Sequence, residues 1–513
     1  MRRTVLQLVC LAICCSTVWS DSATRQELTW STNSPKARAL FDRGLAKYDR
    51  VRYKEAAELF RQAFVEDPEF AAALLFRGLA GDSIPDIRRS RELAGKVPEP
   101  EQLFIQSYKA HYDGKLPEAI ESAEKAVKLL PREPRLRLRV AQLQRAALRR
   151  PEALAEAQGA IAIDPAFAPA YNLLGELYIA EREFDKAIQA RTRYAELLPG
   201  EAEPLQAIAH TYQQMQEFPK AIEFYTRALK ADPDYVNVYR RRGDARFFAG
   251  DVEGARKDYQ RGFDRAKGLD RDGPLYATAF TYVHEGAIDK ALETYHRAIA
   301  IGEEDGNYHS IIAGNNALGQ SLLEAGRLDD AAAAYERAYR AAMRAPEFTD
   351  RDRGFYTAQS HHARGRIAAR RGDFKGAMKE VAEFRVAMKA SGYSNAVYND
   401  KSYQYLLGYI LLEKREYEGA LGALLLANTD DVFIKLLLAR AHQGLGDNDI
   451  AYTLMQEIAD YTLGSVASSI ARPQALRWLA EKGAAAKPAS APDSKSKLKT
   501  KSQLNRSGPT DLV

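Results

Sequence analysis

Cysteine is missing from most of this chain. The 513 residues contain three cysteines, Cys10, Cys14 and Cys15, and all of them lie in an N-terminal leader. For the rest of the chain the sequence therefore predicts no disulfide, no thiolate nucleophile and no cysteine-bound metal. Long apolar runs are missing too. No stretch of about 18 apolar residues follows the leader, so no internal membrane span is expected.

Motifs of known catalytic chemistry are also absent. His361 and His362 are the only adjacent histidines, and neighbours on a helix point apart, so the two cannot share a metal. The sequence contains no His-Glu-x-x-His, no glycine-rich phosphate loop after a strand and no Gly-x-Ser-x-Gly. We therefore predict no catalytic, cofactor-binding or metal-binding residue, and a protein that is not an enzyme.

The body of the chain has almost no excess of charge of either sign. The whole sequence carries +5, but residues 484–513 contribute +4 and the leader contributes +2, which leaves −1 for residues 21–483. A nearly neutral body gives no support for nucleic-acid binding, so no nucleic-acid partner is expected. Residues 484–513 are rich in Ala, Ser, Pro and Lys and are predicted to be a disordered basic tail. Two roles stay open for this tail, a solubilising end and a weak contact with anionic surfaces.

Residues 1–20 have the pattern of a signal peptide. Arg2 and Arg3 are followed by the apolar run from Val5 to Cys15, and small residues precede a cut before Asp21. We expect an exported protein, periplasmic or secreted after cleavage. An N-terminal membrane anchor is the alternative. Residues 21–34 are short and polar and are predicted to be a linker.

The segment from Ala168 to Pro199 contains a two-helix pattern. It reads Tyr171-x2-Leu174-Gly175-x2-Tyr178, then a polar break, then a second apolar-periodic run that contains Ala187 and ends at Pro199. We expect the small Gly175 and Ala187 to be the point at which the two helices touch. The alanine returns every 34 residues at Ala119, Ala153, Ala187, Ala221 and Ala255, and prolines follow in phase at Pro131, Pro165, Pro199 and Pro233.

This pattern resembles the tetratricopeptide repeat, whose signature has an aromatic residue, Leu-Gly, Tyr, Ala and Pro at these offsets. Looser copies follow at Ala291, Ala331, Ala377, Ala420 and Ala451, and an earlier one contains Ala56, Phe60 and Pro68. The resemblance extends to predicted bacterial secreted or periplasmic repeat proteins of undefined activity. It implies an all-α fold, a right-handed superhelical solenoid of about twelve hairpins.

The spacing of the repeats suggests the domain organisation. We predict a regular array over residues 35–267, a looser array with loop insertions over 268–462, and a capping helix over 463–483 with Trp478 as its buried anchor. Oligomeric state cannot be derived from these patterns.

The resemblance also implies a concave groove lined by the first helix of each hairpin. Residues four apart on one helical face are the candidates for partner binding. They are Asn172, Glu176, Gln206, His210, Arg240, Asp244, Tyr276, Phe280, Asn316, Gln320, His362, Arg366, Tyr405 and Tyr409. The arginines between Arg135 and Arg150 are interpreted mainly as solvated or paired with nearby acids.

From these features we predict a non-enzymatic scaffold of the cell envelope that binds protein or peptide partners in its groove, without a cofactor. Two alternatives stay open. One is a regulatory or sensory accessory subunit of an envelope enzyme or of a secretion or assembly complex. The other is an enzyme with a site that its motifs do not reveal.

Overall fold

A computed structural model describes residues 28–81, 83–267, 271–392, 396–462 and 464–483. Within these ranges the chain is a succession of α-helices with one short 3-10 turn and no strand, so the all-α prediction is confirmed. No helix in the described ranges combines the length and the apolar content needed to cross a bilayer. Proline often occupies the first turn of a helix, as at Pro35, Pro134 and Pro169, where its missing N–H costs nothing.

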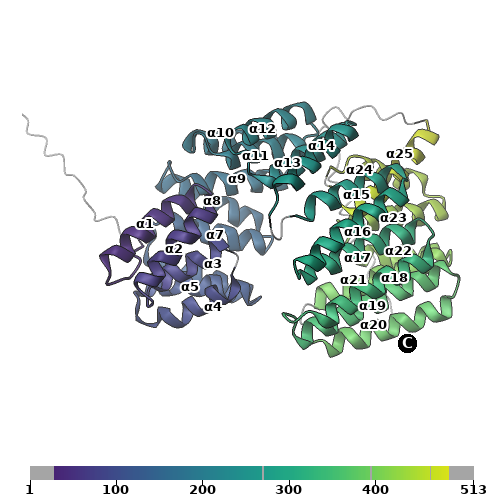
Figure 1. Cartoon of the computed structure of the whole chain (residues 1–513), viewed down its shortest axis with the longest axis horizontal. Helices are drawn as coiled ribbons and strands as arrows, with labels where there is room; N and C mark the ends of the chain where they lie inside the picture. The colour runs from purple at the N-terminus through teal and green to yellow at the C-terminus, as the bar shows by residue number, and fades with distance from the viewer. Residues whose placement is uncertain (1–27, 82, 268–270, 393–395, 463, 484–513) are drawn as a thin grey trace, which may run out of the picture. The chain divides into compact units, whose positions relative to one another are not determined.

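The chain divides into two compact units, residues 1–211 and 212–513, with the division inside α11. Figure 1 labels the helices of both units. The first unit contains α1 (Pro35–Asp49), α2 (Tyr53–Glu66), α3 (Ala71–Gly81), α4 (Ile84–Leu93), η1 (Ala94–Lys96), α5 (Glu99–Tyr112), α6 (Leu116–Leu129), α7 (Pro134–Ala146), α8 (Arg150–Ile163), α9 (Ala168–Ala180), α10 (Phe184–Leu197) and the start of α11 (Ala202–Gln214). Helices α1 to α10 pair consecutively as five hairpins. The degraded repeat after Leu74 is thus still a hairpin, α3 with α4.

The second unit continues with α12 (Phe218–Ala231), α13 (Val236–Phe248), α14 (Val252–Arg265), α15 (Gly273–Glu285), α16 (Ile288–Glu304), α17 (Tyr308–Glu324), α18 (Leu328–Arg344), α19 (Asp350–Arg370), α20 (Phe374–Ala390), α21 (Ala396–Glu413), α22 (Tyr417–Leu426), α23 (Val432–Leu445), α24 (Asn448–Ala459) and α25 (Val466–Glu481). Helices α13 to α24 form six hairpins. The boundary predicted near residue 268 rests on a change in the spacing of the repeats. The boundary between the two compact units lies earlier in the chain, between residues 211 and 212.

In five hairpins a glycine of the first helix lies against a large side chain of the second helix. The phased alanines are buried, with Ala187, Ala221 and Ala255 fully inaccessible. However, Gly175 does not face Ala187. A Cβ on Gly175 would lie 2.7 Å from Cγ of Arg191, sixteen residues later. Gly44 faces Phe60, Gly243 faces Tyr259, Gly319 faces Tyr335 and Gly408 faces Leu424 at the same offset. The predicted contact pair was therefore wrong by one helical turn, because the long side chain at this position lies over the glycine.

The turn between the two helices of a hairpin requires a left-handed backbone. Gly114, Gly250 and Gly326 supply it with φ values of +76°, +92° and +81°. Val51 and Leu148 adopt the same region with φ values of +61° and +59°, although a side chain with a Cβ is disfavoured there. The short turn leaves no other geometry for the chain, so these hairpins carry some backbone strain.

The residues before α1 belong to the core of the first unit. Leu28 and Trp30 are buried, and the Trp30 ring lies 5.3 Å from Phe76 and 5.4 Å from Phe104, centroid to centroid. The Ser31 amide donates to Oε2 of Glu101 at 2.9 Å. The sequence predicts a polar linker over 21–34. Its described part, 28–34, instead packs against α3 and α5, because the Trp30 ring fills a site between three phenylalanines.

Helix α25 lies across the second unit rather than only at its end. It packs against α23 and α24, as a cap would, but also against α15 and α17. Its buried apolar side chains, Ile470, Ala471, Ala475 and Leu479, join one core cluster with residues of α15, α17 and α23. Trp478, the predicted anchor, is only partly buried. The signal peptide and the basic tail fall outside the described residues.

Two glycines of one hairpin offer a test of the contact between its helices. Gly408→Ala places a Cβ 2.6 Å from Cγ of Leu424, whereas a Cβ on Gly422 of α22 has no neighbour within 4 Å. We expect Gly408→Ala to lower the free energy of unfolding by about 1–3 kcal/mol through overpacking. Gly422→Ala should be neutral or stabilising by up to about 1 kcal/mol, because alanine is the better helix former. Denaturant unfolding measures both, and equal effects would contradict the proposed contact.

Glu101 makes the stability of the first unit depend on pH. Burial raises the pKa of Glu101 from 4.5 to about 7, although the hydrogen bond from Ser31 acts to lower it. Since the folded state holds this proton more tightly, stability should fall as pH rises from about 4.5 to about 7 and stay level above that, by at most about 1.4 kcal/mol for each pH unit. Glu101→Gln keeps an oxygen for the Ser31 amide and removes the charge.

The stability gained by Glu101→Gln should therefore grow across this pH window. Denaturant unfolding at several pH values measures the difference, with Glu99→Gln in the exposed first turn of α5 as the control. A gain that is constant with pH would contradict the assignment.

Candidate functional site

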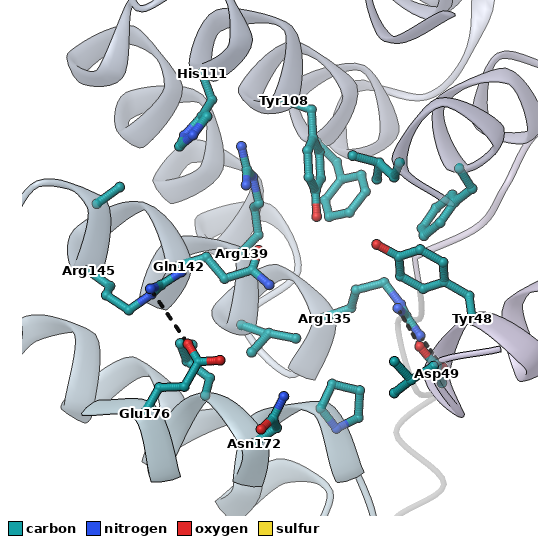
Figure 2. Close-up of a pocket in the computed structure, with 18 of the residues that line it drawn as sticks. Tyr48, Asp49, Tyr108, His111, Arg135, Arg139, Gln142, Arg145, Asn172 and Glu176 are labelled. Atoms are coloured by element: carbon teal, nitrogen blue, oxygen red, sulfur yellow. Dashed lines mark hydrogen bonds and ion pairs between the residues drawn. The ribbon is translucent and has the colours of Figure 1, made fainter. Parts of the chain in front are cut away.

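The first helices of the hairpins in the first unit surround a cavity of about 510 Å³. They contribute residues from five helices, α1, α3, α5, α7 and α9, with Val51, Tyr53 and Tyr194 at one edge. The polar side chains labelled in Figure 2 come from α1, α5, α7 and α9 and surround a common space. Two of the predicted groove residues, Asn172 and Glu176 of α9, line it.

Ion pairs close the first unit around this cavity. Glu201, whose side chain is 8% exposed, accepts from Nη2 of Arg50 at 2.8 Å and from Nε of Arg52 at 2.9 Å. Between these arginines, Val51 packs in a cluster with Tyr194 and Leu198. The first hairpin therefore contacts residues that follow the fifth one, and Val51 and Tyr194 at this contact also line the cavity.

Aromatic side chains form much of the wall. Tyr48, Tyr53, Phe76, Phe104 and Tyr108 all line the cavity. Burial raises the pKa of Tyr53 to about 12 and that of Tyr48 well above its usual value, so both hydroxyls stay protonated. Such a wall offers apolar area and hydroxyl groups together, which is typical of protein-binding sites.

Three arginines of α7 line the cavity, and they differ in their partners. Arg135 forms a bidentate pair with Asp49, at 3.0 and 2.6 Å. Arg145 lies 3.6 Å from Glu176. Figure 2 shows both pairs as dashed lines. Arg139, in contrast, forms no ion pair with a carboxylate of the described residues.

Arg139 is a buried cation without a carboxylate. It is 5% exposed, and it donates to Oγ and to the carbonyl oxygen of Ser107, both at 3.0 Å. Its guanidinium carbon lies 3.6 Å from the ring centroid of Tyr108. No ion pair to Arg139 is formed by the residues that the structure describes. Burial lowers its pKa. The interpretation of most of this cluster as solvated or paired therefore does not extend to Arg139, which is neither.

His111 adds a neutral polar group beside Arg139. Its Nδ1 atom is buried and has no hydrogen-bond partner within the described part of the chain. Burial, and then the charges of Arg139 and Arg145, lower the pKa of His111 below its usual value. The cavity thus contains an uncompensated arginine next to an unsatisfied ring nitrogen, both of which a polar ligand could satisfy.

The remaining predicted residues take several roles. In the second unit Arg240 pairs with the buried Asp244 at 3.2 Å, and Tyr259 donates to Asp244 at 2.8 Å. Tyr276 donates to the Ser310 carbonyl at 2.9 Å, and Phe280 packs against the core. Tyr409 is buried and donates to Glu324 at 3.0 Å. Asn316, Gln206 and His210 are partly exposed, with Oε1 of Gln206 buried and without a partner among the described residues.

Four predicted residues share a second cavity. Gln320, His362, Arg366 and Tyr405 line a space of about 480 Å³ within the second unit. Beside it, α25 packs against α15, α17 and α23, which are first helices of their hairpins. Part of the inner face of the second unit is therefore covered by the chain itself. As partner-binding residues the fourteen positions stay predictions.

The candidate sites contain no recognisable catalytic or metal-binding arrangement. In the described ranges, no three His, Cys, Asp or Glu side chains are grouped so that they could hold a metal ion. The residues that sequence reasoning missed are Tyr108, His111 and Arg139. The spacing of Arg135 and Arg139, four apart on α7, was the signal that could have indicated them.

Comparisons with known proteins agree with the repeat pattern. The family model described as tetratricopeptide repeat matches residues 36–86, 207–270 and 316–387. Among solved structures, MamA of Desulfovibrio magneticus RS-1 is 13% identical with a TM-score of 0.30, over 33% of this chain and 96% of that one. TTC0263 of Thermus thermophilus is 20% identical with a TM-score of 0.28, over 41% and 99%. YrrB, titled a TPR protein with an unusual peptide-binding site, is 18% identical with a TM-score of 0.28, over 36% and 93%. No curated protein matches the sequence.

Proposed function

The chain is a tetratricopeptide repeat protein, and from that premise we propose that it is an exported, non-enzymatic scaffold whose first unit binds a peptide segment of a partner protein. Tetratricopeptide repeats commonly serve protein interaction. The observation that supports the proposal is the tyrosine-lined cavity of about 510 Å³ around the unpaired Arg139.

The composition of the cavity favours a peptide with an acidic side chain. Asp49 pairs with Arg135, and Glu176 pairs more loosely with Arg145. Arg139 has no such partner among the described residues. A carboxylate of the ligand would form a charge-assisted hydrogen bond there, where burial excludes competing water. The tyrosines and Asn172 would contact the neighbouring peptide groups.

Synthetic peptide pools test this proposal on the full mature chain. We compare a pool that carries one fixed Glu among randomised positions with the same pool carrying Gln. Fluorescence anisotropy should show at least about tenfold tighter binding of the Glu pool, or about 1.4 kcal/mol. Arg139→Met should remove that preference, because it removes the cavity arginine that has no carboxylate partner among the described residues. Added salt should weaken the binding of the Glu pool.

Arg149→Met, at an exposed position in the same hairpin, is the matched control and should bind as the unchanged protein does. If Arg139→Met is poorly folded, Arg139→Lys, which keeps the charge, is the variant to use instead. Equal binding of the two pools, or an equal loss in both Met variants, would contradict the proposal.

Export is the second part of the proposal. Arg2, Arg3 and the apolar run to Cys15 support a cleaved leader, after which the chain would contain no cysteine. When the protein is expressed in a bacterium with the leader intact, N-terminal sequencing of the envelope fraction should begin at Asp21. Arg2→Glu with Arg3→Glu should leave uncleaved protein in the cytoplasm. A start at Met1 in membrane-bound protein would favour the anchor instead.

A further inference from the structure

The second cavity lies where α25 begins. Its wall includes Gln320 of α17, His362 and Arg366 of α19, Tyr405 of α21 and the start of α23. Residues Ser465, Val466 and Ala467 complete it. The first turn of α25 is therefore part of the wall of this cavity of about 480 Å³.

Arg366 is the buried cation of this cavity. It is 7% exposed, and its two terminal nitrogens donate to the hydroxyls of Tyr405 and Tyr335, both at 3.1 Å. Its Nε atom is buried and finds no acceptor within the described residues, which also place no carboxylate within ion-pair distance of Arg366. A buried guanidinium that contacts only neutral hydroxyls keeps most of the cost of its desolvation.

The first turn of α25 adds free backbone donors. Ser465 is the N-cap, and its hydroxyl accepts from the Ser468 amide at 3.1 Å in a capping box. The amides of Val466 and Ala467 precede the first bonded turn and have no acceptor in the part of the chain that the structure describes. They stand at the positive end of a helix of 16 residues.

The acidic groups near the cavity are already engaged. Asp431 lines it, but its Oδ1 atom caps α23 by accepting from the amides of Phe433 and Ile434 at 2.7 and 3.1 Å. Glu324 lies 3.5 Å from Arg370 and accepts from Tyr409. Burial lowers the pKa of His362 well below its usual value, so this ring is neutral. Glu324 acts on Arg366 only through space, and no carboxylate of the described residues forms an ion pair with it, so a ligand anion could still pair with Arg366.

We propose that this cavity is an oxyanion site, in which a phosphate or carboxylate group accepts from the first-turn amides of α25 and pairs with Arg366. The two features are independent, one being a buried side chain of α19 and the other the backbone of α25. Because the anion would bind the start of α25, its binding would also stabilise α25 on α15, α17 and α23. This site does not depend on the cavity of the first unit.

A proline at the first position of α25 tests the backbone donors without breaking the helix. Val466→Pro removes one amide at a position where proline is favoured, and Ser465 already has the extended backbone that a following proline requires, with φ −154° and ψ 166°. Asp350→Pro is the matched control. It also follows an extended N-cap, Thr349, in a capping box, and it does not line the cavity.

Calorimetric titration of the full mature chain with inorganic phosphate, and separately with acetate, at constant ionic strength measures binding. Val466→Pro and Arg366→Met should each weaken binding at least tenfold, and Asp350→Pro should change it less than twofold. Hydrogen exchange in residues 466–481 should slow with the anion in the unchanged protein. Tighter binding of phosphate would identify a phosphorylated ligand, and tighter binding of acetate a carboxylate, and both results support the site.

Three results would overturn the proposal. The first is no saturable binding of either anion, and the second is equal behaviour of Val466→Pro and Asp350→Pro. The third is bound anion that leaves the exchange of residues 466–481 unchanged. Val466→Pro keeps the test decisive if Arg366→Met fails to fold. Arg149→Met, at an exposed position of the first unit that lines neither cavity, should bind phosphate as the unchanged protein does.

Discussion

The close approach of two helices at a small residue is the contact on which the rest of the structure depends. Gly44, Gly243, Gly319 and Gly408 each lie under a ring or branched side chain sixteen residues later. This contact fixes how one helix of a hairpin sits on the other, and hence which face of the first helix is left for the inner surface. A single hairpin cannot bury its apolar side, so each needs its neighbours.

The inner surfaces of the two units share one chemical feature. In each unit a buried arginine contacts tyrosines rather than a carboxylate: Arg139 lies over Tyr108, and Arg366 donates to Tyr335 and Tyr405. By contrast, Arg242 in the second unit is buried with a bidentate partner, Asp258, at 2.8 and 2.6 Å. The chain therefore can pair its buried arginines, and within the described residues these two have no ion-pair partner at their cavities.

Local periodicity made the repeat fold predictable. The phased alanines are buried as expected, and residues chosen four apart on first helices include Gln320, His362, Arg366 and Tyr405, which share a cavity. Distant contacts were not predictable. Nothing in the pattern around Trp30 indicates a site between phenylalanines of three helices, and nothing near Ile470 indicates α15 as its neighbour.

The same limit explains why the predicted groove residues lie in different environments. Tyr405 and Tyr409 are one turn apart, yet the first lines a cavity and the second is buried against Glu324. Spacing selects a helical face, but it does not reveal how far the neighbouring helix covers that face. Arg139 was missed for the related reason that its environment comes from α5, not from its own hairpin.

The course of α25 restricts how this protein can evolve. An open solenoid tolerates the gain or loss of a repeat, because each repeat touches only its neighbours. In the second unit α25 packs against the earlier helices α15 and α17, and Gln213 donates to the carbonyl of Thr462, 249 residues away, at 2.9 Å. Duplication of one hairpin between them would move these partners apart. The number of repeats in this unit is thus fixed by a contact outside the repeats, and the fold of the unit cannot be completed until the ribosome has made α25.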